Sequence, residues 1–170
     1  QPREGAGQAV DLLASGALME QAIEAASMLS ALGYAPAIWS ITSYTELARE
    51  AESCEREARL NPLLAAPDCH LQKIFGDLTG PIVAVSDYQK SLAGSIAKWM
   101  PASYTALGTD GFGVSGTRPE LRDYFEVSAK HIVQTVLVAL FRQGLIDEKT
   151  LMLQLTPLGI KHNKPDPAAR

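Results

Sequence analysis

Short apolar runs alternate with amphipathic helical patterns along most of this 170-residue chain, and this alternation constrains the fold more than any other feature. The clearest run, from Ile82 to Val85, contains no polar residue, as expected of a strand buried on both faces of a parallel sheet. Three further runs are predicted to be strands, at 9–15, 36–42 and 104–107. Strands that alternate with helices form a mainly parallel sheet with helices on both faces. The sequence therefore predicts a three-layer α/β domain over residues 9–156.

Apolar residues also recur at helical spacing between and after the predicted strands. They predict helices over 18–32, from 44 to about 60, over 89–100 and over 129–143. Ser43 and Glu46 have the spacing of a capping box at the start of the second of these helices. Residues 126–127 are expected to form a brief antiparallel strand at one edge. That strand would bring the mainly parallel sheet to about five strands.

The segments outside these elements are expected to be irregular. Residues 1–8 are polar and glycine-containing, and we expect a linker from upstream domains there. Residues 62–80 lack a clear period apart from a short helix at 71–75. The proline-containing tail over 157–170 is expected to be loosely held.

A glycine-rich loop follows the strand predicted at 104–107 and ends where a new helix begins. Its glycines indicate tight or left-handed backbone, which glycine adopts at low cost. Thr117 and Glu120 have the spacing of a capping box, which would open the next helix. The apolar Phe112 is expected to hold the loop against the domain. We therefore interpret the loop as structural, shaped by Gly108, Asp110, Gly111, Phe112, Gly113 and Ser115.

Composition excludes some classes of partner. The chain has a net charge of −4 and no basic cluster, so neither nucleic acid nor an anionic membrane surface is an expected partner. No uninterrupted apolar run approaches the roughly 18 residues that a membrane span needs. An apolar content of 46% and a charged content of 20% suit one soluble domain.

The cysteines and histidines suggest no metal site. Cys54 and Cys69 lie in no spacing typical of a metal or redox motif, and we expect reduced thiols in a cytoplasmic protein. Asp68, Cys69 and His70 are adjacent, but no second ligand group with zinc-like spacing accompanies them. His131 falls in the first turn of a predicted helix, where the helix dipole disfavours a cation. A neutral, hydrogen-bonded imidazole is therefore expected at that position.

No motif supplies a complete active site. The glycines of Gly111–Gly116 match the dinucleotide fingerprint by spacing, but that fingerprint belongs to the first strand-to-helix turn. Neither a P-loop lysine nor a Gly-x-Ser-x-Gly elbow is present. Ser15, Ser86 and Asp87 lie at predicted strand ends, on the edge where open α/β sheets bind ligands. The sequence thus predicts no catalytic, cofactor-binding or metal-binding residue, and leaves a ligand at the strand ends as an alternative.

Several longer motifs occur in the order seen in one family. They are Gly-Thr-Asp-Gly-Phe-Gly-x-Ser over 108–115, then Arg118, Leu121-Arg122 and Phe125-Glu126-Val127, and upstream the segment 40–49, Cys54-Glu55-Arg56 and Asp87-Tyr88-x-Lys90. In these motifs residues 9–156 resemble the C-terminal domain of the transketolase superfamily. The fuller form of the pattern is similar to that of the homodimeric pyruvate dehydrogenases.

This resemblance implies a parent enzyme that decarboxylates pyruvate with thiamine diphosphate and magnesium and then acetylates a lipoyl group. In that family the cofactor lies between the two preceding domains, across a homodimer interface. The implied partners are therefore those domains, a second subunit and the lipoyl acyltransferase of the complex.

None of the family's catalytic residues has a counterpart in this chain. The cofactor motif begins Gly-Asp-Gly and ends in paired asparagines, whereas here Thr109 precedes Asp110, and the asparagines are Asn61 and Asn163. Two interpretations stay open. The chain is either an assembly domain, inactive and without cofactor by itself, or a regulatory module that binds a small ligand or nucleotide at the strand ends.

Overall fold

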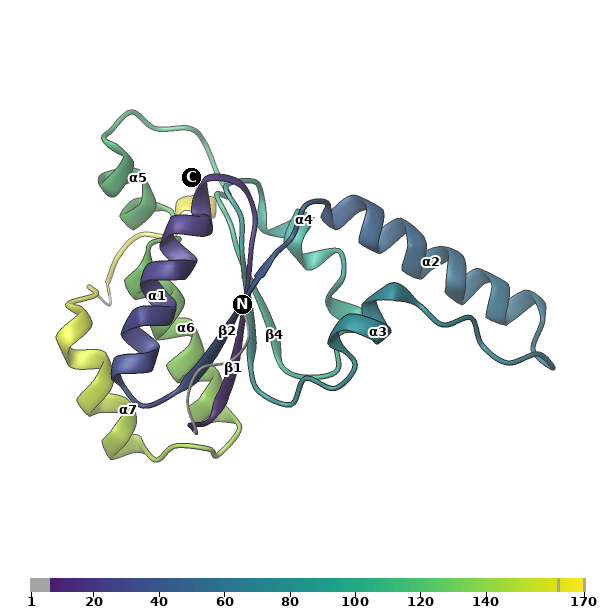
Figure 1. The fold of residues 1–170 in the computed structure, drawn as a ribbon. Coiled ribbons are helices and arrows are strands. Elements are labelled where there is room, and N and C mark those ends of the chain that lie inside the picture. Colours follow the sequence, from purple (N-terminus) through teal and green to yellow (C-terminus); the bar gives the residue numbers. More distant parts are fainter. Residues whose placement is uncertain (1–6, 162, 170) are drawn as a thin grey trace.

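The computed structural model describes residues 7–161 and 163–169, and a parallel sheet forms its centre (Figure 1). The strands are β1 (Ala9–Ala14), β2 (Ala35–Ser40), β3 (Ile82–Val85) and β4 (Tyr104–Leu107). They lie in the order β2-β1-β3-β4, and every neighbouring pair is parallel. The predicted parallel sheet is confirmed.

Seven α-helices accompany these strands within the described residues. They are α1 (Met19–Ala31), α2 (Tyr44–Leu60), α3 (His70–Phe75), α4 (Lys90–Gly94), α5 (Arg118–Tyr124), α6 (Ala129–Arg142) and α7 (Glu148–Leu155). Short 3₁₀ turns lie at Gly16–Leu18, Ala97–Trp99, Thr156–Leu158 and Pro167–Ala169. Among the described residues, no helix combines the length and the apolar character that a membrane crossing requires.

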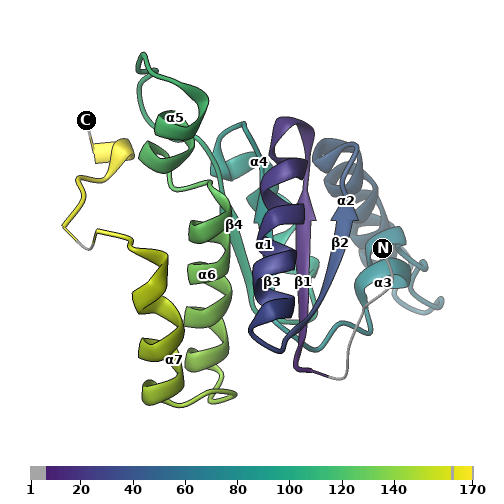
Figure 2. The ribbon, with the colours of Figure 1, turned by 60° about the vertical axis from the view of Figure 1, so that its left-hand side comes forward.

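Helices cover both faces of the sheet, as Figure 2 shows, and the predicted three-layer α/β class is confirmed. Successive side chains of a strand point to opposite faces. Leu12 of β1 therefore packs in a core with α1 and α6, whereas its neighbour Leu13 packs in a second core with α2, α3 and α4. Helix α7 packs on α6 and adds Leu151 to the first core.

The sheet has four strands within the described residues, so the expectation of about five was wrong. The segment predicted as an edge strand lies in the turn that follows helix α5. Glu126 has a φ of 60°, and the N–H of Val127 donates to the carbonyl of Arg122 at 2.9 Å. Val127 is buried under this turn. The pattern at 126–127 was too short to distinguish a buried helix end from a strand.

Capping signals place two helix starts as predicted. The hydroxyl of Ser43 accepts the N–H of Glu46 at 3.2 Å, at the beginning of α2. Thr117 and Glu120 form the capping box of α5, in which the Glu120 carboxylate accepts the N–H of Thr117 at 2.8 Å. In both cases side chains satisfy N–H groups that have no partner inside the helix.

The helix predicted over 89–100 is shorter than expected. It divides into α4 and the 3₁₀ turn at Ala97–Trp99. Gly94 and Ser95 follow one another at the break, and both are weaker helix formers than alanine. The hydroxyl of Ser95 also donates to the carbonyl of Leu92 at 2.7 Å, which competes with helical pairing.

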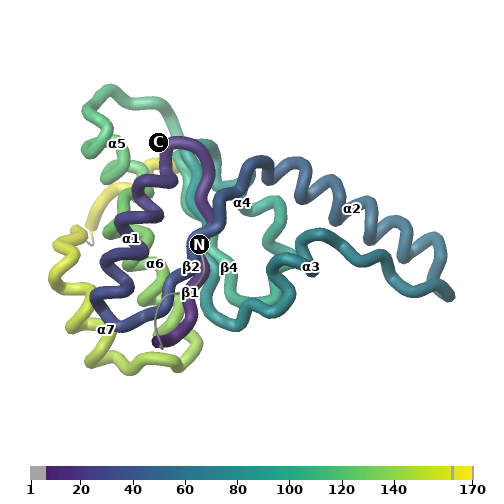
Figure 3. Tube along the Cα trace, in the orientation of Figure 1, coloured from purple at the N-terminus to yellow at the C-terminus, as the bar shows by residue number. Residues whose placement is uncertain are grey.

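Helix α2 extends well beyond the sheet, and the chain returns from its end to α3 (Figure 3). We call residues 52–68 the arm, because they lie between buried Ala51 and buried Cys69. Glu55 ties the arm to the domain. Its carboxylate accepts the indole N–H of Trp99 at 2.8 Å and pairs with the ammonium of Lys98 at 2.8 Å.

The described part of the tail packs against the domain, so the expectation of a loosely held tail was wrong for these residues. The ammonium of Lys164 lies 3.3 Å from the carboxylate of Asp123, and Pro167 is buried. The carbonyl of Pro167 lies so near Gly111 that a Cβ at that glycine would come within 2.1 Å of it. The tail and the glycine-rich loop thus meet at one end of the domain.

Candidate functional site at the carboxyl edge of the sheet

The carboxyl ends of β1 and β3 lie side by side at the point where the strand order reverses. β1 pairs with β2 on one side and with β3 on the other. Open α/β sheets bind their ligands at such a switch point. The hydroxyl of Ser15 donates to that of buried Ser86 at 3.1 Å, so the fold brings these two predicted strand-end residues together.

Asp87 lies beside the start of the turn that follows β1. Gly16 has a φ of 58°, and a Cβ at this position would lie 2.8 Å from a carboxylate oxygen of Asp87. Glycine therefore suits both the backbone angle and the close approach. The backbone carbonyl of Asp87 accepts the hydroxyl of Thr109 at 2.8 Å, which connects this turn to the loop after β4.

The first half of the glycine-rich loop packs tightly on the turn after β3. A Cβ at Gly108 would lie 2.5 Å from the carbonyl oxygen of Tyr88 and 2.6 Å from the backbone nitrogen of Lys90. The N–H of Thr109 donates to the same Tyr88 carbonyl at 2.9 Å. Asp110 accepts the N–H of Lys90 at 2.9 Å, and its other oxygen lies 3.7 Å from the ammonium of Lys90. Asp110 therefore caps the start of α4.

The second half of the loop is open. Phe112 is 74% exposed, so its expected role as an apolar anchor was wrong. Gly113 has no atom within 4 Å of a Cβ built on it, apart from its chain neighbours. Ser115 is exposed, and Val114 is 42% exposed. Of the six residues predicted to shape the loop, Gly108, Asp110 and Gly111 make close contacts with the domain.

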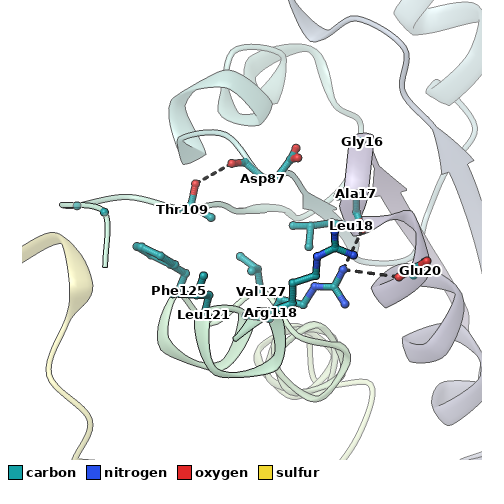
Figure 4. Close-up of a pocket in the computed structure, with 13 residues that line it drawn as sticks. Gly16, Ala17, Leu18, Glu20, Asp87, Thr109, Arg118, Leu121, Phe125 and Val127 are labelled. Atoms are coloured by element: carbon teal, nitrogen blue, oxygen red, sulfur yellow. Dashed lines mark hydrogen bonds and ion pairs between the residues drawn. The ribbon is translucent and has the colours of Figure 1, made fainter. Parts of the chain in front are cut away.

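A cavity of about 570 Å³ lies between this edge, the start of α1 and helix α5 (Figure 4). Leu121, Phe125 and Val127 form an apolar wall. The guanidinium of Arg122 donates to the carbonyl of Ala17 at 3.3 Å and lies 3.6 Å from the carboxylate of Glu20.

Arg118 also lines the cavity, and its guanidinium forms no hydrogen bond or ion pair with any described residue. Two guanidinium groups thus line the cavity together with Asp87. That of Arg122 is paired within the domain, whereas that of Arg118 has no partner among the described residues. Both arginines come from α5, a helix that the sequence predicted without assigning a role to its basic residues.

His131 is neutral and hydrogen-bonded, as predicted. Its Nδ1 lies 2.8 Å from the hydroxyl of Ser128. Burial lowers the pKa of the imidazole to about 4, and the nearby ammonium of Lys164 lowers it further. The side chain lies inside the helical layer, away from the cavity, and we see a structural role for it.

The adjacent residues Asp68, Cys69 and His70 do not converge on one point. The carboxylate of Asp68 pairs with Lys73 at 3.2 Å, whereas the thiol of buried Cys69 donates to Glu50 at 3.5 Å. The thiol of Cys54 donates to the same carboxylate at 3.8 Å. Glu50 and Cys54 lie one turn apart on α2, but Cys69 comes from outside that helix, and only the fold brings it near them, so the cluster was not predicted from the sequence.

The fold and this edge define an α/β domain of a known class. A family model, the transketolase-like TK C-terminal domain, matches residues 1–128. The chain belongs to this family, and the resemblance inferred from the motifs is confirmed.

The curated relatives indicate a narrower group of proteins within this family. The pyruvate dehydrogenase E1 component of Mycolicibacterium smegmatis is 39% identical over 145 residues, which cover 85% of this chain and 16% of that protein. The E1 component of Escherichia coli K12 is 37% identical over 166 residues, covering 96% of this chain and 18% of the relative. The chain therefore spans less than a fifth of the length of these relatives.

Solved structures support the fold alone, because their identity to this chain is low. A split-gene transketolase, an inactive beta4 tetramer, superposes with a TM-score of 0.53 at 21% identity, over 82% of this chain and 41% of that one. The transketolase of Campylobacter jejuni superposes with a TM-score of 0.52 at 21% identity, over 79% of this chain and 17% of that one.

Proposed function

We propose that this chain is the C-terminal assembly domain of a thiamine-dependent pyruvate dehydrogenase E1 component, without catalytic activity of its own. The parent would decarboxylate pyruvate with thiamine diphosphate and magnesium and acetylate the lipoyl group of an acyltransferase. Its partners would be the preceding domains and a second subunit, in the cytoplasm. The similarity to E1 components over most of this chain supports the proposal.

The residues of this chain do not fit a thiamine diphosphate or magnesium site. Asp110, the acidic residue that most resembles part of the cofactor motif, accepts the N–H of Lys90 and caps α4. The cavity wall formed by Leu121, Phe125 and Val127 is apolar, and the guanidinium of Arg118 would repel a cation in that cavity. We therefore assign no step of the reaction to this segment.

The observation that carries the assembly role is the apolar tip of the arm. Leu60 is 61% exposed, Leu63 is 98% exposed and Leu64 is 69% exposed. They lie at and just after the end of α2, the part of the arm that extends farthest from the sheet (Figure 3). Clustered exposed leucines on a soluble domain mark a surface that another protein surface covers. Because the chain spans less than a fifth of its relatives, the remainder of the parent is the occupant we propose.

Two measurements test this function. The isolated chain should neither bind thiamine diphosphate in calorimetry nor decarboxylate pyruvate, and tight cofactor binding would contradict the proposal. Mixed with the separately expressed remainder of its parent, the chain should form a complex that sediments as one species. Replacing both Leu63 and Leu64 by serine should weaken that complex, whereas Ile23→Ser, on exposed α1 surface, should not.

A second candidate function rests on Arg118. A guanidinium without a partner among the described residues, in a partly apolar cavity at the switch point, suits a small organic anion. A thermal-shift screen with nucleotides, phosphates and acyl-CoA would detect such a ligand, because a ligand that binds the folded state raises the melting temperature. A shift that Arg118→Ala abolishes would favour a regulatory module over a purely structural one.

A further inference from the structure

We infer that Glu50, Cys54 and Cys69 form a binding site for a soft divalent cation, with Zn²⁺ as the natural occupant, at the base of the arm. The three groups come from α2 and from the residue that precedes α3. One carboxylate oxygen and two thiol sulfurs lie within 4.8 Å of one another. Thiolate and carboxylate are ligands that Zn²⁺ accepts together in proteins.

The distances between the carboxylate oxygens of Glu50 and the two sulfurs are close to those that such an ion requires. The sulfur of Cys69 lies 3.5 Å from one carboxylate oxygen of Glu50, and the sulfur of Cys54 lies 3.8 Å from the other. In a tetrahedral site, Zn–S and Zn–O bond lengths place oxygen and sulfur ligands about 3.6 Å apart and two sulfurs about 3.8 Å apart. The side chains are thus already near ligand spacing.

The carboxylate of Glu50 is also held in position. The N–H of His70 donates to its two oxygens at 3.0 and 3.2 Å, at the first residue of α3. Hydrogen bonds of this kind orient metal ligands. Glu50 forms no ion pair with a cationic side chain among the described residues. Its side-chain partners are the thiols of Cys54 and Cys69.

Ligation of a cation by the two cysteines requires their thiolate forms. On binding, both thiols would lose their protons to solvent, so binding of the cation should weaken as the pH falls.

The three protein ligands leave a fourth position for water. Glu50 and His70 line a groove of about 580 Å³ that gives water and ions access to the cluster, whereas Cys69 is only 4% exposed. A cation at this site would bind α2 to the start of α3. It would therefore fix the direction in which the arm leaves the domain.

Cobalt titration of the reduced 170-residue chain tests the site. We expect Co²⁺ to give thiolate-to-metal charge-transfer absorption and visible d–d bands of a tetrahedral complex, and Zn²⁺ to abolish both by displacement. Cys54→Ser and Cys69→Ser should each weaken Zn²⁺ binding at least about tenfold, and the double variant should give no charge-transfer band.

Two carboxylate variants complete the test. Glu50→Gln keeps an oxygen that can accept the N–H of His70 but loses the negative charge, so it should remain folded by circular dichroism and bind Zn²⁺ more weakly. Glu46→Gln, on an exposed position of the same helix, should bind like the unmodified chain. The inference is overturned if the reduced chain gives no thiolate band. It is equally overturned if the double cysteine variant binds Zn²⁺ unchanged, or if the thiols form a disulfide in the presence of the metal.

Discussion

Gly108 is a position at which one added methyl group should destabilise the domain. A Cβ there would come within 2.5 Å of the Tyr88 carbonyl oxygen and 2.6 Å of the Lys90 nitrogen. Both atoms belong to backbone, so no side chain can rotate to relieve the contact. The turn after β3 would have to move away from the loop in Gly108→Ala.

The hydrogen bonds across this contact give the size of the effect. The Tyr88 carbonyl accepts the N–H of Thr109, and the Lys90 N–H donates to the carboxylate of Asp110, each at 2.9 Å. A neutral hydrogen bond contributes about 1 kcal/mol and one to a charged group about 1.5–3 kcal/mol. Displacing the turn should therefore lower the free energy of unfolding by about 2–4 kcal/mol.

Urea unfolding and thermal melts of Gly108→Ala measure this loss. In a chain of this length about 1 kcal/mol corresponds to roughly 2–4 °C, so the melting temperature should fall by roughly 10 °C. Gly113→Ala is the matched control, because open space surrounds a Cβ there and its φ lies outside the left-handed region. Equal melting temperatures for the two variants would refute the reasoning from loop contacts.

Three further predictions concern the same end of the domain. Asp110→Ala removes the charged acceptor at the start of α4 and should cost about 1.5–3 kcal/mol in urea unfolding, whereas Asp110→Asn should cost less. Gly111 has a φ of 102°, and a Cβ there would meet the carbonyl of Pro167, so Gly111→Ala should lower stability and expose the tail to proteolysis. The pKa of His131 is lowered to about 4 in the folded state, so the unfolded state binds more protons below pH about 6.5. Stability should therefore fall as the pH drops from about 6.5 toward 4, by at most about 1.4 kcal/mol per unit, and His131→Gln should flatten that dependence.

The regular parts of the fold could be predicted because their signals are local. The apolar run Ile82–Val85 predicted β3, and side chains with the spacing of capping boxes predicted the starts of α2 and α5. Each of these signals depends on residues within one or two turns of each other. The parallel order of the strands followed from the helices between them.

The failures share a different physical origin. Phe112 has a large apolar side chain of the kind that anchors a loop. Whether such a side chain is buried depends on which segments pack over it, and no described segment covers Phe112. Glu50, Cys54 and Cys69 converge because the chain leaves the end of α2 and runs back to α3. This returning segment has irregular backbone, and no hydrophobic periodicity predicts its path. Contacts set by such a return can be found only from the folded chain.

The state of the carboxyl edge bears directly on the choice between assembly and ligand binding. Groups that would meet a ligand at a switch point are mostly occupied by the domain itself: Ser15 pairs with Ser86, Asp110 caps α4, and Arg122 donates to a carbonyl. A ligand that displaced them would have to offset the hydrogen bonds it broke. Arg118 is the exception, so an anion bound through that side chain is the form of ligand binding that this edge could support without rearrangement.

The exposed leucines of the arm carry no such internal cost, and burying them against the rest of the parent chain is favourable by about 25 cal/mol for each Å² covered. On these energetic grounds the arm, rather than the carboxyl edge, is where this domain should make its principal contact.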